Sequence, residues 1–277
     1  MVGLLLVIII CLLIGLITAT IGGLMGLGGG IILIPSLLFM SSYSEAFAWA
    51  TPQTIVGISL ITMIFTALSS TIAYNKKGRV DYKTGLLFLS GSIPGGIIGS
   101  WLNQYIASDD FLLYFGFLTI MISMLFFIKR KPPAKKVSGK NKMMRTFHLE
   151  GKVYRYTVSA WAAFVLSLGV GTLSGLFGIG GGSIMVPAMI LLFGFPAHIA
   201  TATSMFMILF ISIVGASTHI VLGHIAWKYV LAFIPGAWFG GKFGAMINQM
   251  LSGKTIEWIL RILLIIIGVR MMIQGLS

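Results

Sequence analysis

Eight apolar segments, each about 20 residues long, limit what this chain can fold into. A helix needs roughly 20 apolar residues to cross the hydrocarbon core of a bilayer. Of the 277 residues, 57% are hydrophobic and 9% are charged, whereas about a quarter of an ordinary soluble domain is charged. We therefore expect an all-α integral membrane protein with eight transmembrane helices. The predicted spans cover residues 2–22, 47–73, 85–106, 110–128, 157–176, 197–222, 226–248 and 255–274.

The net charge of +13 is concentrated in two polar segments. Residues 129–155 carry +9 and residues 75–84 carry +3. Basic residues confined to loops between apolar spans are typical of cytoplasmic loops under the positive-inside rule, and such short loops exclude a nucleic-acid-binding surface. With eight crossings, this pattern predicts a multi-pass protein of the cell (inner) membrane whose N- and C-termini are cytoplasmic.

Residues 129–156 form the one long polar stretch, and we interpret them as a basic cytoplasmic linker. It separates a first unit, residues 1–128, from a second unit, residues 157–277. Within the linker, residues 147–156 alternate between apolar and polar side chains, which fits either a short β-hairpin or a peptide resting on anionic lipid.

The two units share four sequence blocks in the same order, which indicates an internal repeat. Because four spans per unit is an even number, both units should enter the membrane from the same side, related by an axis near the membrane normal. The matched blocks are Gly26–Pro35 with Gly178–Pro187, Ala50-Thr51 with Ala200-Thr201, Gly78–Lys83 with Gly223–Lys228, and Ile93–Gly95 with Ile234–Gly236.

A glycine cluster precedes a short apolar piece in each unit, at residues 31–40 and 183–194. These pieces are too short to cross a bilayer, so we expect re-entrant segments at residues 26–40 and 178–194. The start of such a half-helix carries unpaired backbone N–H groups and a partial positive charge, which together bind small anions. The alternative is that the glycines only allow close helix packing.

The candidate substrate-binding residues are the two glycine clusters and the hydroxyl and amide side chains that open spans two and six. For the latter, interhelical hydrogen bonding is the alternative. The full set is Gly28, Gly29, Gly30, Gly180, Gly181, Gly182, Ser183, Thr51, Gln53, Thr54, Thr201, Thr203 and Ser204.

Lys242 and Arg261 are the basic residues well inside predicted spans, and charges there are functional by default. We expect them to recruit an anion; the alternatives are that they snorkel outward or that Arg261 pairs with Glu257. Structural roles fall to four prolines inside or beside apolar segments, namely Pro35, Pro187, Pro94 and Pro235.

Catalytic and metal-binding patterns are scarce in the sequence. The six acidic residues lie mostly in loops or at span ends, and the histidines lack metal-ligand spacing. The single cysteine, Cys11, excludes an internal disulfide. We expect no enzyme activity, no cofactor and no metal.

The doubled Gly-x-Gly-Gly-Gly-x-x-x-x-Pro motif, the Ala-Thr pairs and the two later blocks resemble the sulfite exporter TauE/SafE family of permeases. The resemblance implies a transporter of small anions, typically sulfite, sulfonates or other sulfur compounds, and export as the direction. The chain departs from internal symmetry where Ala-Thr-Pro-Gln-Thr at 50–54 faces Ala-Thr-Ala-Thr-Ser at 200–204.

The resulting hypothesis is an anion permease in the lipid bilayer, with the substrate held between two half-helix N-termini. A passive anion channel and a non-transporting scaffold that docks through the basic linker are the alternatives. The coupling ion, a proton or sodium, and a homodimer remain open at this point.

Overall fold

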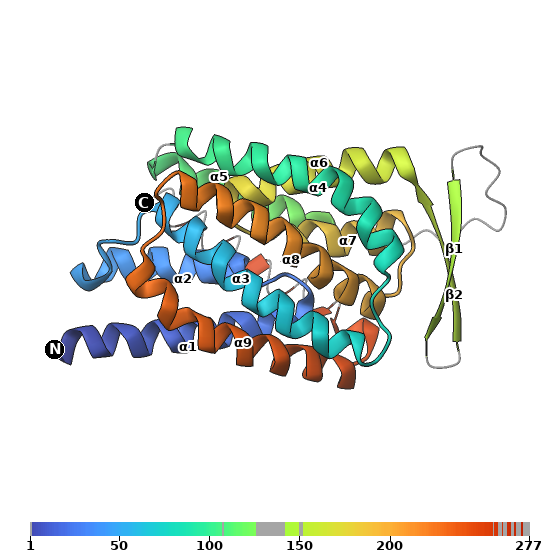
Figure 1. Ribbon diagram of the computed structural model, residues 1–277, viewed down its shortest axis with the longest axis horizontal. Coiled ribbons are helices and arrows are strands. Elements are labelled where there is room, and N and C mark those ends of the chain that lie inside the picture. Colours follow the sequence, from blue (N-terminus) through green and yellow to red (C-terminus); the bar gives the residue numbers. More distant parts are fainter. Residues whose placement is uncertain are drawn as a thin grey trace.

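The protein is an elongated bundle of helices with a two-stranded hairpin at one end (Figure 1). The computed structural model describes residues 2–106, 108–125, 142–149 and 152–256, together with seven positions between 258 and 273. The helices are α1 (Val2–Met25), α2 (Gly30–Tyr43), α3 (Pro52–Asn75), α4 (Tyr82–Leu102), α5 (Ser108–Leu125), α6 (Ala160–Phe177), α7 (Gly182–Leu192), α8 (Ala197–Val221) and α9 (Trp227–Met250), with short 3₁₀ turns η1 (Glu45–Phe47) and η2 (Asn103–Tyr105); the strands are β1 (Lys142–Leu149) and β2 (Lys152–Ser159).

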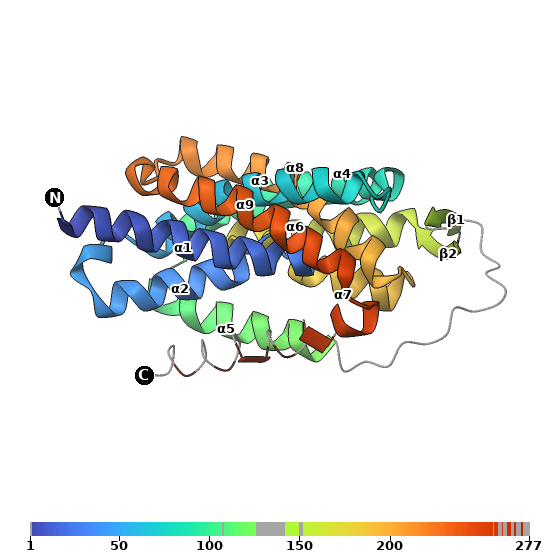
Figure 2. The ribbon, with the colours of Figure 1, turned by 90° about the horizontal axis from the view of Figure 1, so that it is seen from below.

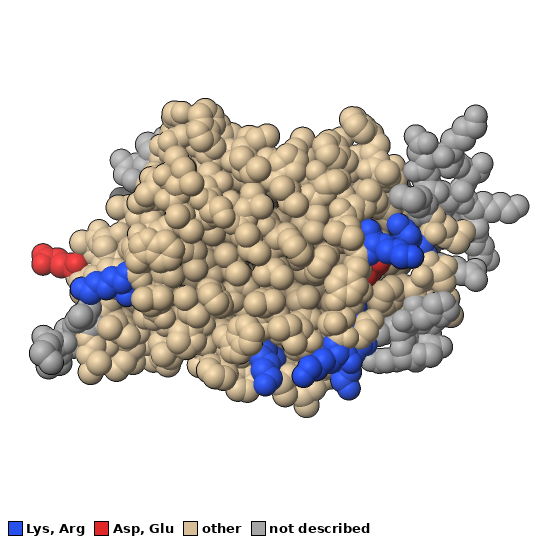
Figure 3. All heavy atoms as spheres, in the orientation of Figure 1, with Lys and Arg blue, Asp and Glu red and all other residues tan. Residues whose placement is uncertain are grey.

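Six of these helices, α1, α3, α4, α6, α8 and α9, are long and apolar enough to cross a membrane. Large apolar side chains such as Phe117, Trp161 and Phe239 are exposed on the outside of the bundle, and the visible charged residues lie mostly towards its ends (Figure 3). The chain is therefore a helical, multi-pass membrane protein. Of the two other predicted spans, 110–128 overlaps α5, within which Leu113–Ile122 is an apolar stretch, and 255–274 lies largely outside the described residues.

Close packing at glycines fixes the direction of two helix pairs. In α9, Gly236 packs against Leu12 of α1 and Gly244 against Thr20, so α1 and α9 run parallel. In α4, Gly91 packs against Phe164 of α6 and Gly99 against Thr172, so α4 and α6 also run parallel.

Contacts with α3 and α8 connect these two pairs. Ser70 of α3 donates a hydrogen bond to Gly241 of α9, and Gln249 of α9 donates one to Ala73 of α3, so α3 is parallel to α9. Gly85 of α4 contacts Phe206 of α8, and Ser100 of α4 contacts Gly215 of α8, so α8 is parallel to α4. Helix α3 is antiparallel to α8, because Gly57 near its start lies beside His219 near the end of α8. Hence α1, α3 and α9 point one way, and α4, α6 and α8 point the other way.

This arrangement overturns the expectation that both units enter from the same side. Helices α1 and α6 are antiparallel, so the units are related as in transporters with inverted repeats, with an axis across the bundle. The reason is that α2 turns back beside α1 (Figure 2), and thus returns the chain to the end where α1 began. The short helix adds a pass that the expected count of four spans per unit leaves out.

The same arrangement separates two regions that were both expected to face the cytoplasm, the start of α1 and the basic loop 76–81. Helix α1 begins at the end of the bundle opposite the basic loop 76–81 (Figure 1). The two cannot both face the cytoplasm if the bundle spans the membrane. The expected cytoplasmic C-terminus falls outside the described residues.

The register of the matched positions also differs from the sequence match. Ser59 and Ser204 each donate to a glycine-loop carbonyl, that of Gly178 or Gly26, at 2.8 Å. Asn103 and Asn248 likewise donate to the carbonyls of Leu176 and Leu24, at 2.7 and 2.6 Å. In both cases the donors are 145 positions apart and the acceptors 152. A single offset of 145 therefore applies from α3 to α4.

The Ala-Thr and Ile-Pro-Gly blocks were consequently aligned in the wrong register. Thr51 is the N-cap of α3, whereas Thr201 lies inside α8. The offset of 145 aligns α4 with α9. In this alignment Pro94 and Pro235 are about one helical turn apart.

A β-hairpin forms the later part of the linker, which departs from a purely helical fold. Strands β1 and β2 pair antiparallel, from Lys142 opposite Ser159 to Leu149 opposite Lys152. The hairpin alternative for residues 147–156 is thus confirmed, with longer strands. Because β2 runs directly into α6, Tyr156 and Val158 are buried at the end of the bundle near loop 76–81.

Candidate functional site

The two glycine loops, residues 26–29 and 178–181, meet inside the bundle. Gly30 packs against the carbonyl of Gly178, and Gly182 packs against the carbonyl of Gly26. A Cβ atom on either glycine would collide with the carbonyl oxygen that it faces. Gly29 and Gly181, the N-caps of α2 and α7, have φ of +99° and +67°, which L side chains rarely adopt. Glycine is therefore required both for the turn and for the close approach.

Each loop presents buried backbone amides without acceptors. Helix α2 makes its first bonds from Ile32 and Leu33 to the carbonyl of Gly29, at 3.1 and 3.0 Å. Within the described residues, no acceptor pairs with the amides of residues 28–31, nor with those of residues 180–183 at the start of α7. A buried unpaired N–H is costly, and a cluster at a helix N-terminus suits an anion.

A buried hydroxyl adds to the second loop. Ser183 is fully buried, and its Oγ has no hydrogen-bond partner in the part of the chain that the structure describes. The Oγ of Ser174 is also buried without such a partner and faces Gly181. The position of Ser183 in the first unit is taken by Ile31, so the two loops differ in polarity.

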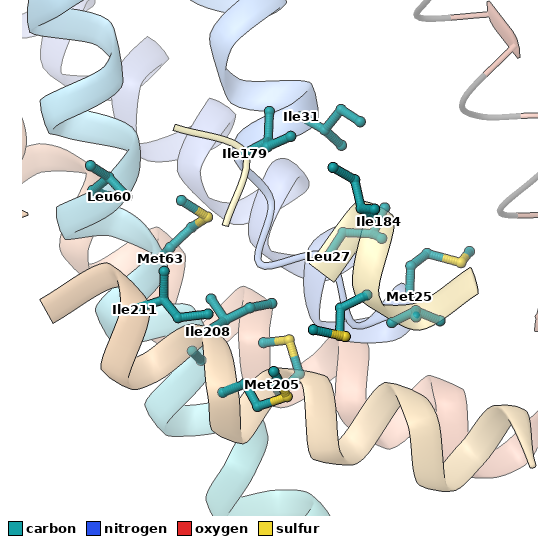
Figure 4. Close-up of a cluster of buried hydrophobic side chains, with 14 of the residues drawn as sticks. Met25, Leu27, Ile31, Leu60, Met63, Ile179, Ile184, Met205, Ile208 and Ile211 are labelled. Carbon is teal, nitrogen blue, oxygen red and sulfur yellow. The ribbon is translucent and has the colours of Figure 1, made fainter. Parts of the chain in front are cut away.

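Apolar side chains surround both loops (Figure 4). The sulfur of Met63, from α3, contacts the backbone at Gly28, Gly30 and Gly180, and Ile208, from α8, contacts it at Gly28 and Gly182. Met63 and Ile208 are again 145 positions apart. Dipoles in such a weakly polar setting interact with an anion more strongly than they would in water.

Of the predicted hydroxyls on α8, two lie beside the first loop. Ser204 bonds the carbonyl of Gly26, and the backbone of Thr201 packs against the same glycine while its hydroxyl bonds Ala197 at 2.8 Å. Thr203 points elsewhere, since it accepts a hydrogen bond from the N–H of Asp81 at 3.0 Å.

Thr51, Gln53 and Thr54 lie at the start of α3, away from the loops. Thr51 caps the helix by accepting from Thr54, and Gln53 donates to the carbonyl of Ile106 at 3.1 Å. They lie five to eight residues before Ser59, roughly 8 to 12 Å along the helix, and Ser59 does contact a loop. The sequence interpretation missed Ser59; the repeat register of 145 from Ser204 would have identified it.

Lys242 is exposed on the outer face of α9, next to the exposed Phe239 and Phe243. The opposite face of that helix, with Gly240 and Gly244, packs against α1. Lys242 therefore does not face the loops, and this favours the alternative that its side chain snorkels outward. Arg261 lies outside the described residues. Pro35 and Pro187 are each the sixth residue of their short helix.

A second polar cluster closes the end of the bundle beneath the hairpin. The buried carboxylate of Asp81 accepts hydrogen bonds from the Thr84 N–H at 3.2 Å, the Thr84 hydroxyl at 2.5 Å and the Tyr156 hydroxyl. Burial, and then the bond to Asp81, raise the pKa of Tyr156 above its usual range. No sequence motif indicated this contact between distant segments.

The described residues contain no cluster of three or more His, Cys, Asp or Glu that could hold a metal.

Comparison with known proteins agrees with this architecture. The family model for sulfite exporter TauE/SafE matches residues 11–271. A "Probable membrane transporter protein YunE" from Bacillus subtilis is 47% identical over 270 residues, covering 97% of this chain and 98% of that protein. A "Probable membrane transporter protein" from Xylella fastidiosa is 26% identical, covering 84% and 81%. A "Probable membrane transporter protein MJ0441" from Methanocaldococcus jannaschii is 24% identical, covering 95% and 94%. No solved structure matches the chain.

The apolar helices, the paired glycine loops and these matches together lead to one conclusion: the chain belongs to the sulfite exporter TauE/SafE family of membrane transporters.

Proposed function

We propose that this protein is a carrier, not an enzyme, that moves small anions, such as sulfite, a sulfonate or a related sulfur oxyanion, across the inner membrane. The observation that supports this most directly is the pair of buried amide clusters, residues 28–31 and 180–183, at the N-terminal ends of two helices that start side by side. Neutral donors hold an anion without a counter-charge, so the anion can also leave. The family resemblance supports export as the direction.

The proposed membrane arrangement keeps the two units, residues 1–128 and 157–277, joined by the linker 129–156. Residues 110–128 and 255–274 add two further spans to the six described, and segments 26–40 and 178–194 enter from opposite faces. The basic loop 76–81 then faces the cytoplasm. The start of α1, Glu45 and the turn 222–226 face the other side.

Tight packing favours a carrier over a passive channel. Met63 and Ile208 contact both glycine loops, so an anion needs the loops or these side chains to move before it can bind. Such a step fits alternating access, in which the two units rearrange around a fixed site.

A flux assay with purified protein in vesicles tests the proposal, with sulfite, sulfate, thiosulfate and a short sulfonate as substrates. Ser183→Ala removes a hydroxyl that bonds no described residue, so folding should be unaffected. If the hydroxyl binds the anion, its loss raises the KM roughly tenfold, about 1.4 kcal/mol. The matched control is Ser212→Ala in α8, another buried serine without a described partner. Folded protein without flux for any of these anions contradicts the proposal.

Gly182→Ala tests the loop itself, because the new Cβ would collide with the carbonyl of Gly26 and approach the Ser204 hydroxyl at 2.9 Å. We expect flux to be lost. Gly169→Ala is the control, since no heavy atom lies within 4 Å of its Cβ position. If Gly182→Ala and Gly169→Ala lose the same amount of flux, the loop glycines contribute to folding alone.

A further inference from the structure

Two histidines form a hydrogen-bonded pair at the end of the bundle where α1 begins. The Nδ1 atoms of His219, in the last turn of α8, and His224, in the following turn, are 3.1 Å apart. His219 is fully buried, and the backbone of Gly175 lies beside its ring. His224 is partly exposed.

The geometry sets how many protons the pair can hold. One Nδ1 must carry a hydrogen and the other a lone pair, so both rings are neutral or one is an imidazolium. One added proton leaves the bond intact and strengthens it, because the donor is then charged. A second added proton places N–H groups on both Nδ1 atoms and breaks the bond.

The pair occupies the positions that Tyr74 and Arg79 occupy in the first unit, 145 residues earlier. The local hydrogen bonds are the same: the N–H of Arg79 donates to the carbonyl of Tyr74 at 3.3 Å, and that of His224 to the carbonyl of His219 at 3.0 Å. The intervening Gly78 and Gly223 have φ of +63° and +74°. A permanent cation at one end of the bundle thus corresponds to a titratable group at the other.

No other ionisable side chain of the described residues interferes with the pair. Its neighbours on α3 include Gly57, and Gly175 of α6 lies on another side, neither with an ionisable side chain. Of the other titratable side chains that the structure describes at this end, Tyr43, Glu45, Tyr105 and Lys228 are exposed. Tyr229 is partly exposed, and Lys228 lies over its ring at 5.6 Å. The other titratable residues of α3 and α4, Tyr74, Tyr82 and Lys83, lie at the opposite end.

We propose that the His219–His224 pair is a proton-binding site that controls anion affinity at this end of the transporter. A proton taken from water gives the pair a charge of +1, at the position that Arg79 occupies in the first unit, and this charge attracts the anion. The less buried His224 carries the charge. This inference rests on the proposed anion transport.

The expected pH range follows from the surroundings of His224. Burial lowers its pKa below the usual value near 6.5, because the charged form loses hydration. The pair is therefore neutral at pH 7 and gains its proton as the pH falls. A bound anion stabilises the charged form, so it shifts this titration to higher pH.

The test combines histidine NMR with flux. The chain has four histidines, 148, 198, 219 and 224, so ring nitrogens in isotope-labelled protein can be assigned with His219→Gln and His224→Gln. The probe is a short sulfonate, whose own charge stays constant between about pH 5 and pH 8. We expect the His219 and His224 signals to titrate together and to move to higher pH when the sulfonate is added.

Flux from the side of the pair provides the second readout. In wild type, the KM for the sulfonate should fall up to tenfold per pH unit during the titration. His224→Gln should keep a high KM and His224→Arg a low one, both independent of pH, while His148→Gln in β1 should behave as wild type. Unchanged pH dependence in His224→Gln, with flux intact, overturns the inference. If no anion is transported by any form while the two rings still titrate together, the proposed function fails and the proton site stands.

Discussion

The two ends of the bundle share a backbone plan but differ in chemistry. At the hairpin end, the carboxylate of Asp81 is bonded by Thr84 and Tyr156, and Arg79 lies 3.5 Å from the ring of His198. At the other end, the position of Asp81 is taken by Ala226. There a stack of Trp49 on Tyr229, with centroids 4.0 Å apart, and the histidine pair replace the fixed charges.

This difference shows which parts of the repeat are constrained by the fold. The serine bonds to the glycine loops and the asparagine bonds near the helix ends occur in both units, because they hold the backbone together. The ends have diverged, since each faces a different compartment in the proposed orientation. Variants at equivalent positions should therefore act alike in the middle and differently at the ends.

The largest effect is expected for Asp81→Ala at the hairpin end. The change leaves the buried hydroxyls of Tyr156 and Thr84 without their acceptor, which should cost about 3 kcal/mol. Denaturant unfolding in detergent measures this cost. Tyr156→Phe, which removes one of the bonds, should cost about half as much. A change below about 0.5 kcal/mol for Asp81→Ala would show that the carboxylate does not hold the hairpin.

Alkaline pH should weaken the same end selectively. Because the pKa of Tyr156 is raised in the folded protein, its contribution is complete below the usual tyrosine pKa near 10 and declines as the pH rises further, by about 1.4 kcal/mol per unit. The rate of proteolysis within the hairpin measures this release. Tyr156→Phe should remove the pH dependence; if it persists, other groups are responsible.

At the opposite end, Tyr229→Ala should have a smaller effect. Loss of the stack on Trp49 should cost about 1 kcal/mol beyond the lost burial. Tyr229→Phe keeps the ring and serves as the control in thermal unfolding. Equal destabilisation by both variants would mean that the hydroxyl, rather than the stack, matters.

The smallest effects, and the most alike, are expected in the middle. Ser59→Ala and Ser204→Ala each remove one 2.8 Å bond to a glycine-loop carbonyl, at about 1 kcal/mol each. Their unfolding free energies should agree within about 0.5 kcal/mol. A much larger cost for one of them would show that the two loops are not held equivalently.

The sequence was informative where the physical signal is local. Apolar runs located six helices that the structure describes, and the glycine clusters located both loops. The helix directions were wrong because α2 and α7 look too short to reverse the chain. The register was wrong because Ile-Pro-Gly recurs one turn away from its structural equivalent. The bond between Tyr156 and Asp81 joins segments 75 residues apart, and no periodicity reports such a contact.

Opposite orientation of the two units can be tested with a matched cysteine pair. Lys77 and Leu222 are 145 positions apart, in equivalent turns at opposite ends of the bundle. Each is changed to cysteine in a Cys11→Ala background, since Cys11 is the single native cysteine. In intact cells, a membrane-impermeant maleimide should label Leu222→Cys and not Lys77→Cys, and inside-out vesicles should give the reverse. Labelling of both cysteines from the same side would contradict the inverted arrangement that brings the glycine loops together.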